Sequence, residues 1–350
     1  MKILYSLLFC LLPAFAWANG PVDEGTVEKR KTITKLFDVD ANDALTVDNQ
    51  FGQVSIGLWD RNEIRIQITV TANSSSDERV QRFLDAVTID EKRSGNQIVV
   101  RTNFSQSTTG NWNVSSWKSN GERNFVRIDY AVMMPKQNTL TVRNKFGNTS
   151  IPAFHAPLSV YSRYGNFDAN ELTSQQTDID VAYGKAMINA LSTAKLDMAY
   201  GSLDLNQVNV LTLVNKFGKM HIGDVGKLTA DIDYSGSSSI GTLRESGQIK
   251  LSFSGGFRIE QLPATANTVA IQASYSSVVL PADNGSDFDV TVSYGNFTYG
   301  NGSSMRFTMQ PSDSDGHRGP RLTKQYIGTV GRGTGPKIRV ISKFGNVQFK

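Results

Sequence analysis

Five aspartates recur at regular intervals between residues 178 and 233, and they are the residues best placed for acid–base chemistry. They alternate with apolar residues, so we expect them to point outward from successive strands, near Arg163 and Lys185. Two carboxylates at a suitable separation could cleave a glycosidic bond. The interleaved small residues, such as Ala182 and Ala199, predict no pocket, so a solvated charged face is the expected reading. The aspartates are Asp178, Asp180, Asp197, Asp231 and Asp233.

Other candidates for catalysis or metal binding are few. Of the three histidines, His155, His221 and His317, none has a second histidine at metal-binding spacing. The oxygen-rich segments 283–287 and 313–316 lack the full EF-hand spacing and consist of ordinary turn residues, which leaves calcium binding there open. No nucleophile elbow or phosphate loop is present. We therefore expect no catalytic residue, no metal and no cofactor.

Two tryptophans, Trp112 and Trp117, lie in a segment rich in serine, asparagine and glycine at 105–124. Exposed indoles often mark recognition surfaces, including surfaces that stack on sugars. The alternative is that they fold back as a small cluster onto the α/β cap expected at the N-terminal end of the chain. We predict that this pair contacts a partner or glycan.

The strands that position these candidate residues belong to an internal repeat. Each copy is an alternating strand, an aromatic residue, usually a glycine, and a second short strand, as in LTVRNKFG at 140–147 and LTLVNKFG at 211–218. Successive aromatics lie 17 to 22 residues apart, and outlying copies occur at Phe51-Gly52 and Phe344-Gly345. The nine central aromatics are Phe146, Tyr164, Tyr183, Tyr200, Phe217, Tyr234, Phe253, Tyr275 and Tyr294.

Apolar residues stand four and six places before most of these aromatics, with mainly polar residues between them, which indicates half-buried strands. After the glycine, the alternation of apolar and polar positions is displaced by one residue. We attribute this displacement to a bend at the glycine. One rung cannot bury its own apolar face, so rungs must stack about 4.8 Å apart. The sequence thus predicts a mainly β fold, a single-stranded β-solenoid of about 17–19 residues per rung. We expect the aromatics to be packing residues in one column; a ligand-stacking face is the alternative.

The repeat is interrupted at 57–135. Ser75 and Glu78 form a capping box before a predicted amphipathic helix at about 76–87, and a hairpin surrounds residues 94–96. We expect residues 19–135 to form the first rung plus an N-terminal α/β cap that covers its open edge. Residues 136–350 then form the solenoid, with an irregular loop at about 301–336 and a closing C-terminal strand pair.

Residues 1–18 have the pattern of a signal peptide: a basic start, a short apolar run and Ala16-Trp17-Ala18, with cleavage expected after Ala18. The only cysteine, Cys10, lies inside that run, so disulfides and thiol chemistry are not expected in the mature chain. No second apolar run is long enough for a transmembrane segment. The excess of 36 basic over 32 acidic residues is weak and spread along the chain, which does not favour nucleic acid.

The segment FGQVSIGLWD at 51–60, the stacked aromatic-glycine rungs and the glycine-rich stretch before the last strand resemble the bacterial "putative adhesin" domain family of unknown function, which is related to auto-transporter adhesin heads. The resemblance covers roughly residues 40–350 and implies an exported β-solenoid without established catalytic residues. We therefore expect an extracytoplasmic protein of the periplasm, cell surface or medium that is structural, adhesin-like or binding, with an unknown envelope polymer or protein as partner. A carbohydrate-active enzyme using the outward carboxylates is the alternative.

Overall fold

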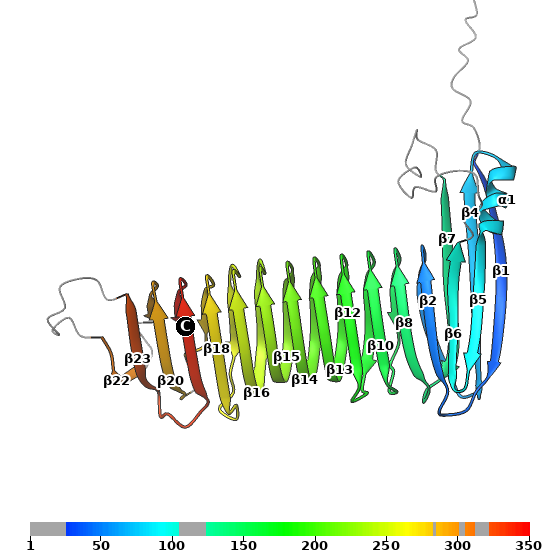
Figure 1. The fold of residues 1–350 in the computed structure, drawn as a ribbon. Helices are drawn as coiled ribbons and strands as arrows, with labels where there is room; N and C mark the ends of the chain where they lie inside the picture. Colours follow the sequence, from blue (N-terminus) through cyan, green and yellow to red (C-terminus); the bar gives the residue numbers. More distant parts are fainter. Residues whose placement is uncertain (1–25, 105–123, 283–284, 301–304, 312–321) are drawn as a thin grey trace, which may run out of the picture.

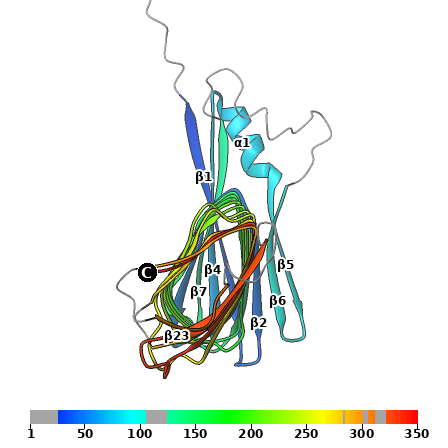
Figure 2. The ribbon, with the colours of Figure 1, turned by 90° about the vertical axis from the view of Figure 1, so that its left-hand side faces the viewer.

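The computed structural model describes residues 26–104, 124–282, 285–300, 305–311 and 322–350. These residues form a mainly β protein with twenty-five strands in one hydrogen-bonded sheet and one helix, α1 (Asp77–Ala86). Strand pairs follow one another in a long row, and the N-terminal strands stand at one end of it (Figure 1). Seen along the row, the successive rungs superpose (Figure 2). Among the described residues, no helix is long and apolar enough to cross a membrane.

Neighbouring copies of the repeat pair in parallel, as predicted. Leu158 lies opposite Leu140 on one side and Thr177 on the other, and Ser202 lies between Lys185 and Lys219. Equivalent positions of successive rungs therefore lie side by side. The rung strands are β8 (Thr139–Lys145), β9 (Thr149–Ile151), β10 (Leu158–Arg163), β11 (Phe167–Leu172), β12 (Thr177–Ala182), β13 (Lys185–Ala199), β14 (Ser202–Lys216), β15 (Lys219–Asp233), β16 (Ser238–Ser252), β17 (Phe257–Gln261), β18 (Thr268–Ser274) and β19 (Val278–Leu280).

The C-terminal strands lie inside the row and do not close it. β24 (Lys337–Lys343) pairs in parallel with β18 on one side and with β20 (Asp287–Ser293) on the other. β25 (Val347–Phe349) lies in the same way between β19 and β21 (Phe297–Tyr299). The predicted closing strand pair is therefore the penultimate rung.

The stretch expected as an irregular loop at about 301–336 contains two strands, which corrects that expectation. β23 (Thr323–Val330) pairs antiparallel with β20, and β22 (Met305–Met309) pairs antiparallel with β23. The physical reason is the open edge of the last rung, whose unpaired backbone groups need partners. The serine and glycine content of the stretch hid these short strands.

Strands also continue beyond the first rung at the N-terminal end. This rung consists of β2 (Ala44–Gln50) and β3 (Val54–Trp59), which pair in parallel with β6 (Gln97–Phe104) and β7 (Phe125–Pro135). Antiparallel partners follow outward: β5 (Val87–Ser94) on β6, then β4 (Glu63–Ser74) on β7 and β1 (Val27–Asp38) on β4. The predicted hairpin is β5–β6, with Gly95 at a φ of 59°.

The helix begins one residue later than the capping box predicts. Ser76, and not Ser75, is the N-cap, and its Oγ accepts a hydrogen bond from the Arg79 backbone N–H at 3.4 Å. The third helical position is therefore Arg79 and not Glu78, so the predicted capping box is wrong. Glu78 and Asp77 still lie in the first turn, where negative charge favours the helix dipole.

Each rung has one strand before the aromatic and one after it, and equivalent strands stack along the row. The core lies between these two stacks of strands, where the inward-pointing side chains of every rung meet. Val142, Val160, Ile179, Leu196 and Leu213, each four places before an aromatic, are buried on consecutive rungs. Burial of such ladders of aliphatic side chains is the main favourable contribution to folding.

A small polar network lies in this core at the N-terminal end. The Asn144 amide donates to the carbonyls of Gly52 at 3.1 Å and Gly147 at 3.0 Å. The Thr102 hydroxyl donates to Asn49 Oδ1 at 3.1 Å, so the Tyr130 hydroxyl, 2.8 Å from Thr102 Oγ1, donates to Thr102. The polar side chains of this network are thus satisfied by backbone carbonyls at the turns and by one another.

Candidate functional site: an exposed aromatic ridge

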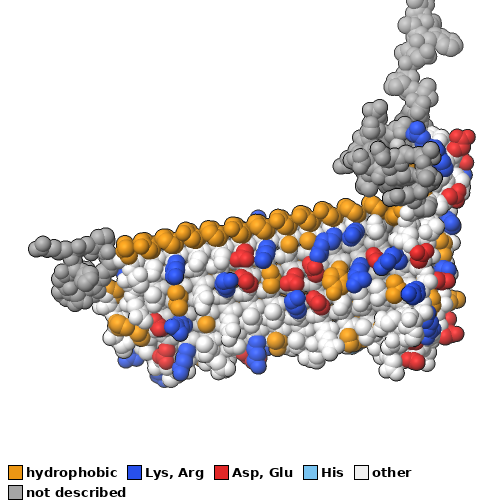
Figure 3. Space-filling view, in the orientation of Figure 1, with side chains coloured by type: hydrophobic (Ala, Val, Ile, Leu, Met, Phe, Trp, Pro, Cys, Tyr) orange, Lys and Arg blue, Asp and Glu red, His pale blue; other side chains and the backbone are white. Residues whose placement is uncertain are grey.

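The aromatics of the repeat form one straight column on the outer surface, which we call the aromatic ridge. Adjacent rings are stacked with centroids 4.7–5.1 Å apart and planes within 3–10° of parallel. Figure 3 shows the ridge as a continuous hydrophobic stripe along one edge of the molecule. In spatial order, the described residues of the ridge are Phe51, Phe146, Tyr164, Tyr183, Tyr200, Phe217, Tyr234, Phe253, Tyr275, Phe344 and Tyr294.

The backbone conformation of the aromatic residue itself turns the ridge outward. All eleven have a positive φ, between 50° at Phe253 and 65° at Phe51. This left-handed conformation is uncommon for residues with a side chain. Side chains of a strand alternate between the core and the surface, and that alternation would place each ring in the core. The left-handed residue reverses the alternation, so the ring lies on the surface. The attribution of the bend to the following glycine was therefore wrong.

Glycine follows eight of the eleven aromatics, and at the turns described next the adjacent rungs approach too closely for a side chain, whereas serine follows Tyr234, Phe253 and Tyr275. A Cβ on Gly184 would lie 2.0 Å from the Gly165 carbonyl oxygen, and one on Gly147 would lie 1.8 Å from that of Gly52. These distances are far below van der Waals contact. The aromatic makes the turn, and the glycine allows the turns to stack.

The rings form the single column that was predicted, but they are exposed and so are not packing residues of the core. Exposure ranges from 45% at Phe146 to 55% at Tyr294, and only Phe51, at the end of the ridge, is less exposed. Each ring covers the faces of its neighbours, so its edge and, in tyrosine, its hydroxyl face the solvent. Within the described part of the chain, the six ridge tyrosines form no side-chain hydrogen bond. The ridge therefore presents aromatic edges and free hydroxyls, and its ring faces are not available for stacking on a sugar.

Basic side chains flank the ridge. The positions directly before the aromatic and two after it hold six cations and one anion, Asp233. Arg163 and Lys185 form ion pairs with Asp180 and, at 3.6 Å, Asp204. The other four cations form no ion pair with any described residue: Lys145, Lys216, Lys219 and Lys343.

The outward carboxylates lie where they were predicted, on successive rungs, but lysine and arginine side chains contact three of the five. Arg163 contacts Asp180, Lys195 contacts Asp197 at 3.3 Å, and Lys250 contacts Asp231 at 3.8 Å. The hydrogen bond to Asp197 raises the pKa of Lys195, and the charges of Asp197, Asp178 and Asp180 act in the same direction. These contacts are typical of a solvated, charge-balanced sheet face.

The histidines are separate from one another. His221 Nδ1 lies 2.9 Å from Ser239 Oγ, and His155 contacts Thr173 on a different part of the row. No group of three metal-ligating side chains occurs among the described residues. His317, Trp112, Trp117 and the oxygen-rich segment 313–316 lie outside the described residues, as do Asp283 and Asn284.

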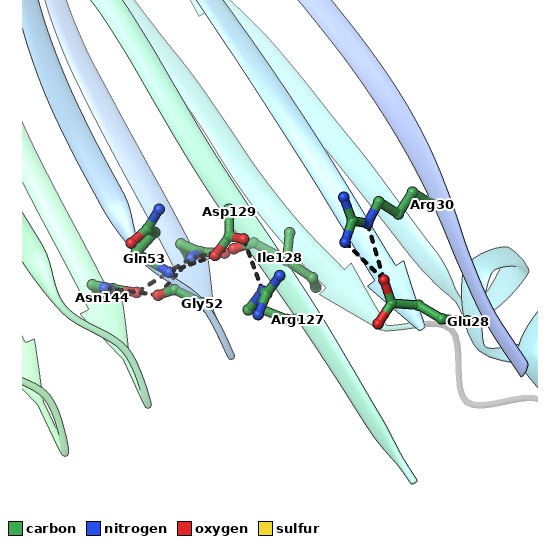
Figure 4. Close-up of polar contacts among 9 residues, drawn as sticks. Glu28, Arg30, Gly52, Gln53, Arg127, Ile128, Asp129 and Asn144 are labelled. Atoms are coloured by element: carbon green, nitrogen blue, oxygen red, sulfur yellow. Dashed lines mark hydrogen bonds and ion pairs between the residues drawn. The ribbon is translucent and has the colours of Figure 1, made fainter. Parts of the chain in front are cut away.

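Phe51, the first ring of the ridge, lies beside the strands at the N-terminal end. Phe104 contacts Phe51 edge-on at 5.4 Å, and a shallow hollow there is lined by Phe51, Phe146, Phe125 and Val126. Beside it, Arg127 contacts Asp129 at 2.9 Å, and Asp129 accepts the Gln53 backbone N–H at 3.0 Å (Figure 4). The strands β4 and β7 and the helix extend past the turns of the rungs (Figure 1), and the ridge runs along those turns in the same orientation (Figure 3), so that it ends at a step.

The sequence matches no family model and no curated protein. Among solved structures, it is similar to a "putative adhesin" from Bacteroides fragilis, with 12% identity over 91% of this chain and 97% of that chain and a TM-score of 0.30. A "putative lipid binding protein" from Parabacteroides distasonis has 9% identity over 91% and 96%, with a TM-score of 0.34. A "putative adhesin" from Parabacteroides merdae has 14% identity over 91% and 96%, with a TM-score of 0.25.

Structures named as putative adhesins are thus among those to which this chain is similar.

Proposed function

We propose that this chain is an exported, non-enzymatic β-solenoid, covered by an α/β cap at its N-terminal end, that binds a partner of the cell envelope along the aromatic ridge. The signal-peptide pattern at 1–18 supports export, and the parallel pairing of rungs supports the solenoid. The ion pairs on the aspartate face support a role without catalysis.

The observation that carries the proposal is the exposure of the ridge. Ten of the eleven ridge aromatics are about half exposed, and together they present an apolar stripe on the order of 1,000 Å². The largest apolar patch of a typical monomer is about 300–600 Å², and larger patches mark interaction sites. Aromatic residues are also enriched at the centres of interfaces. The ridge is therefore a candidate interaction surface.

The ridge is tested with a double variant, Tyr183→Asn and Tyr200→Asn. Asparagine tolerates the left-handed conformation, so the backbone turn is retained. The matched control, Tyr161→Thr with Tyr299→Thr, removes two tyrosines that lie off the ridge. We expect co-sedimentation of the purified protein with isolated cell-envelope material to fall at least about tenfold in the ridge variant and to stay unchanged in the control. Equal retention of both variants would contradict the proposal.

Trp112 and Trp117 remain a predicted second contact, supported by their position in a polar segment. That segment joins Phe104 to Phe125. Phe104 contacts the first ring of the ridge, and Phe125 lines the hollow beside it.

The carbohydrate-active alternative requires that a bound glycan be cleaved. Incubation of any bound glycan with the protein, followed by analysis of its chain length, separates a binding protein from an enzyme.

A further inference from the structure

We propose that the partner bound along the aromatic ridge is a linear acidic polysaccharide, seated lengthwise with one end at the step formed by the N-terminal strands. This inference rests on the proposed function, because it names the chemistry of the partner for the same surface. The charge beside the ridge, the orientation of its rings, and its shape and pitch favour such a partner.

The charge beside the ridge favours a polyanion. Four lysines without ion pairs to described residues, Lys145, Lys216, Lys219 and Lys343, flank it on both sides. Lys216 and Lys219 bracket the same ring, Phe217, near the middle of the ridge. Further from the ridge, acidic and basic side chains balance, as in the pairs Lys195–Asp197 and Lys227–Glu245. The positive excess is therefore specific to the ridge.

The orientation of the rings favours the same partner. Aromatic edges carry the positive part of the ring quadrupole, and the ridge exposes edges because its faces are stacked. The tyrosine hydroxyls can donate hydrogen bonds to carboxylates or sugar oxygens. A chain of pyranose rings offers apolar C–H groups for the phenylalanine edges and oxygens for the hydroxyls.

The shape of the ridge favours a narrow, extended molecule over a flat surface. Ten steps of 4.7–5.1 Å make a straight ridge roughly 50 Å long. The N-terminal strands rise beyond it at one end, so a planar bilayer cannot contact its whole length (Figure 1). A second copy of the chain would bring the same lysine rows together, and like charges disfavour that pairing. The regular pitch repeats the same ring edge along the ridge, so an extended polymer meets equivalent contacts along its whole length.

Polygalacturonate is the probe, and the matched control is the same polymer with its carboxylates methyl-esterified, which removes the charge and keeps the backbone. We expect the full-length mature protein to bind polygalacturonate and to bind the esterified form at least about tenfold more weakly, with affinity falling as salt rises. The result that overturns the inference is equal binding of both polymers. Stronger binding to phosphatidylglycerol vesicles or to polyglutamate would also overturn it, since it would assign the ridge to a membrane or to an acidic polypeptide.

A pair of variants locates the binding. Lys216→Gln with Lys219→Gln removes two charges beside the ridge, whereas Lys227→Gln with Lys250→Gln removes two ion-paired lysines elsewhere. We expect the first variant to weaken polygalacturonate binding about tenfold, the loss of one or two charge-assisted contacts, and the second to leave it unchanged. Equal effects of the two variants would overturn the inference.

The two proposals fail in different ways. If Tyr183→Asn with Tyr200→Asn abolishes retention on envelope material while no acidic glycan binds, the ridge binds another partner and only this inference is wrong. If that variant retains envelope binding, the proposed function is wrong as well.

Discussion

At the scale of single residues, the conformation of the ridge aromatics was the feature least visible in the sequence. Strand parity places these rings inside, because positions four and six before them are apolar. A left-handed φ at the aromatic overturns that parity, and nothing in the local sequence requires a tyrosine to adopt it. One signal was present: Tyr234, Phe253 and Tyr275 keep the aromatic where serine replaces the glycine directly after it. The aromatic, and not the glycine, is therefore the invariant part of the turn in this chain.

Substitution of Tyr200 tests this conformation. Tyr200 is 48% exposed, stacks on Tyr183 at 4.9 Å and Phe217 at 4.8 Å, and has a φ of 53°. Loss of two stacked pairs should lower the free energy of unfolding by about 1–3 kcal/mol in Tyr200→Ala. Tyr200→Gly should be less destabilised than Tyr200→Ala by about 0.5–1 kcal/mol, since glycine adopts positive φ without steric cost. Urea unfolding measures both, and a glycine variant less stable than the alanine variant would contradict the prediction.

Tyr130 gives the protein a predictable response to alkaline pH. Burial raises the pKa of its hydroxyl from 10.0 to about 12. Above pH 10 the unfolded chain loses this proton and the folded chain keeps it. The free energy of unfolding should therefore fall by about 1.4 kcal/mol per pH unit between pH 10 and 12 through this group alone.

Tyr130→Phe has no such proton to lose. The difference in free energy of unfolding between wild type and variant, measured by urea titration, should be constant below pH 10 and shift in favour of the variant above it. This difference also cancels the contributions of the other tyrosines and lysines. A difference that does not change with pH would show that the hydroxyl ionises equally in both states.

At the scale of elements, the rung strands could be predicted because period-2 alternation survives in every copy. The strands that were missed have no such support. β1 carries charged residues at Glu28, Lys29, Arg30, Lys31 and Lys35, and only its pairing with β4 makes it a strand. β23 lies in a polar stretch, and it pairs with the otherwise open edge of β20. Both depend on partners distant in sequence, which local pattern cannot supply.

The corner glycines allow a direct test of how closely the rungs approach. A Cβ at position 184 would lie 2.0 Å from a backbone carbonyl oxygen, which can move only if the two rungs separate. At position 236 the nearest atom is Lys219 Cε, at 4.0 Å. Gly184→Ala should lower the free energy of unfolding by at least about 2–3 kcal/mol, whereas Gly236→Ala should change it by less than about 0.5 kcal/mol. Similar effects of the two substitutions, measured by denaturant unfolding, would show that corner contact does not limit stacking.

At the scale of the whole molecule, each rung pairs with its two neighbours, so stability should behave as in a one-dimensional stack. Ser202 stands in register with Lys219, so deletion of residues 202–218 brings Lys219 into the position of Ser202. We expect this deletion to fold, with one ring fewer in the ridge and a modest loss of stability. Deletion of residues 202–210 removes half a rung and shifts the register, and we expect it to unfold that region. Circular dichroism and hydrogen exchange distinguish the two, and loss of structure in both would contradict the prediction.

The placement of β24 and β25 inside the row has a consequence for the order of folding. A chain that emerges from its N-terminus can add rungs one after another up to β18 and β19. The next segment in sequence, which carries β20 and β21, cannot yet reach its native position, because that position lies beyond β24 and β25. Its native pairing partners, residues 337–349, come later in the chain. Removal of only fourteen residues, Lys337–Lys350, would therefore cost the stack two layers instead of one.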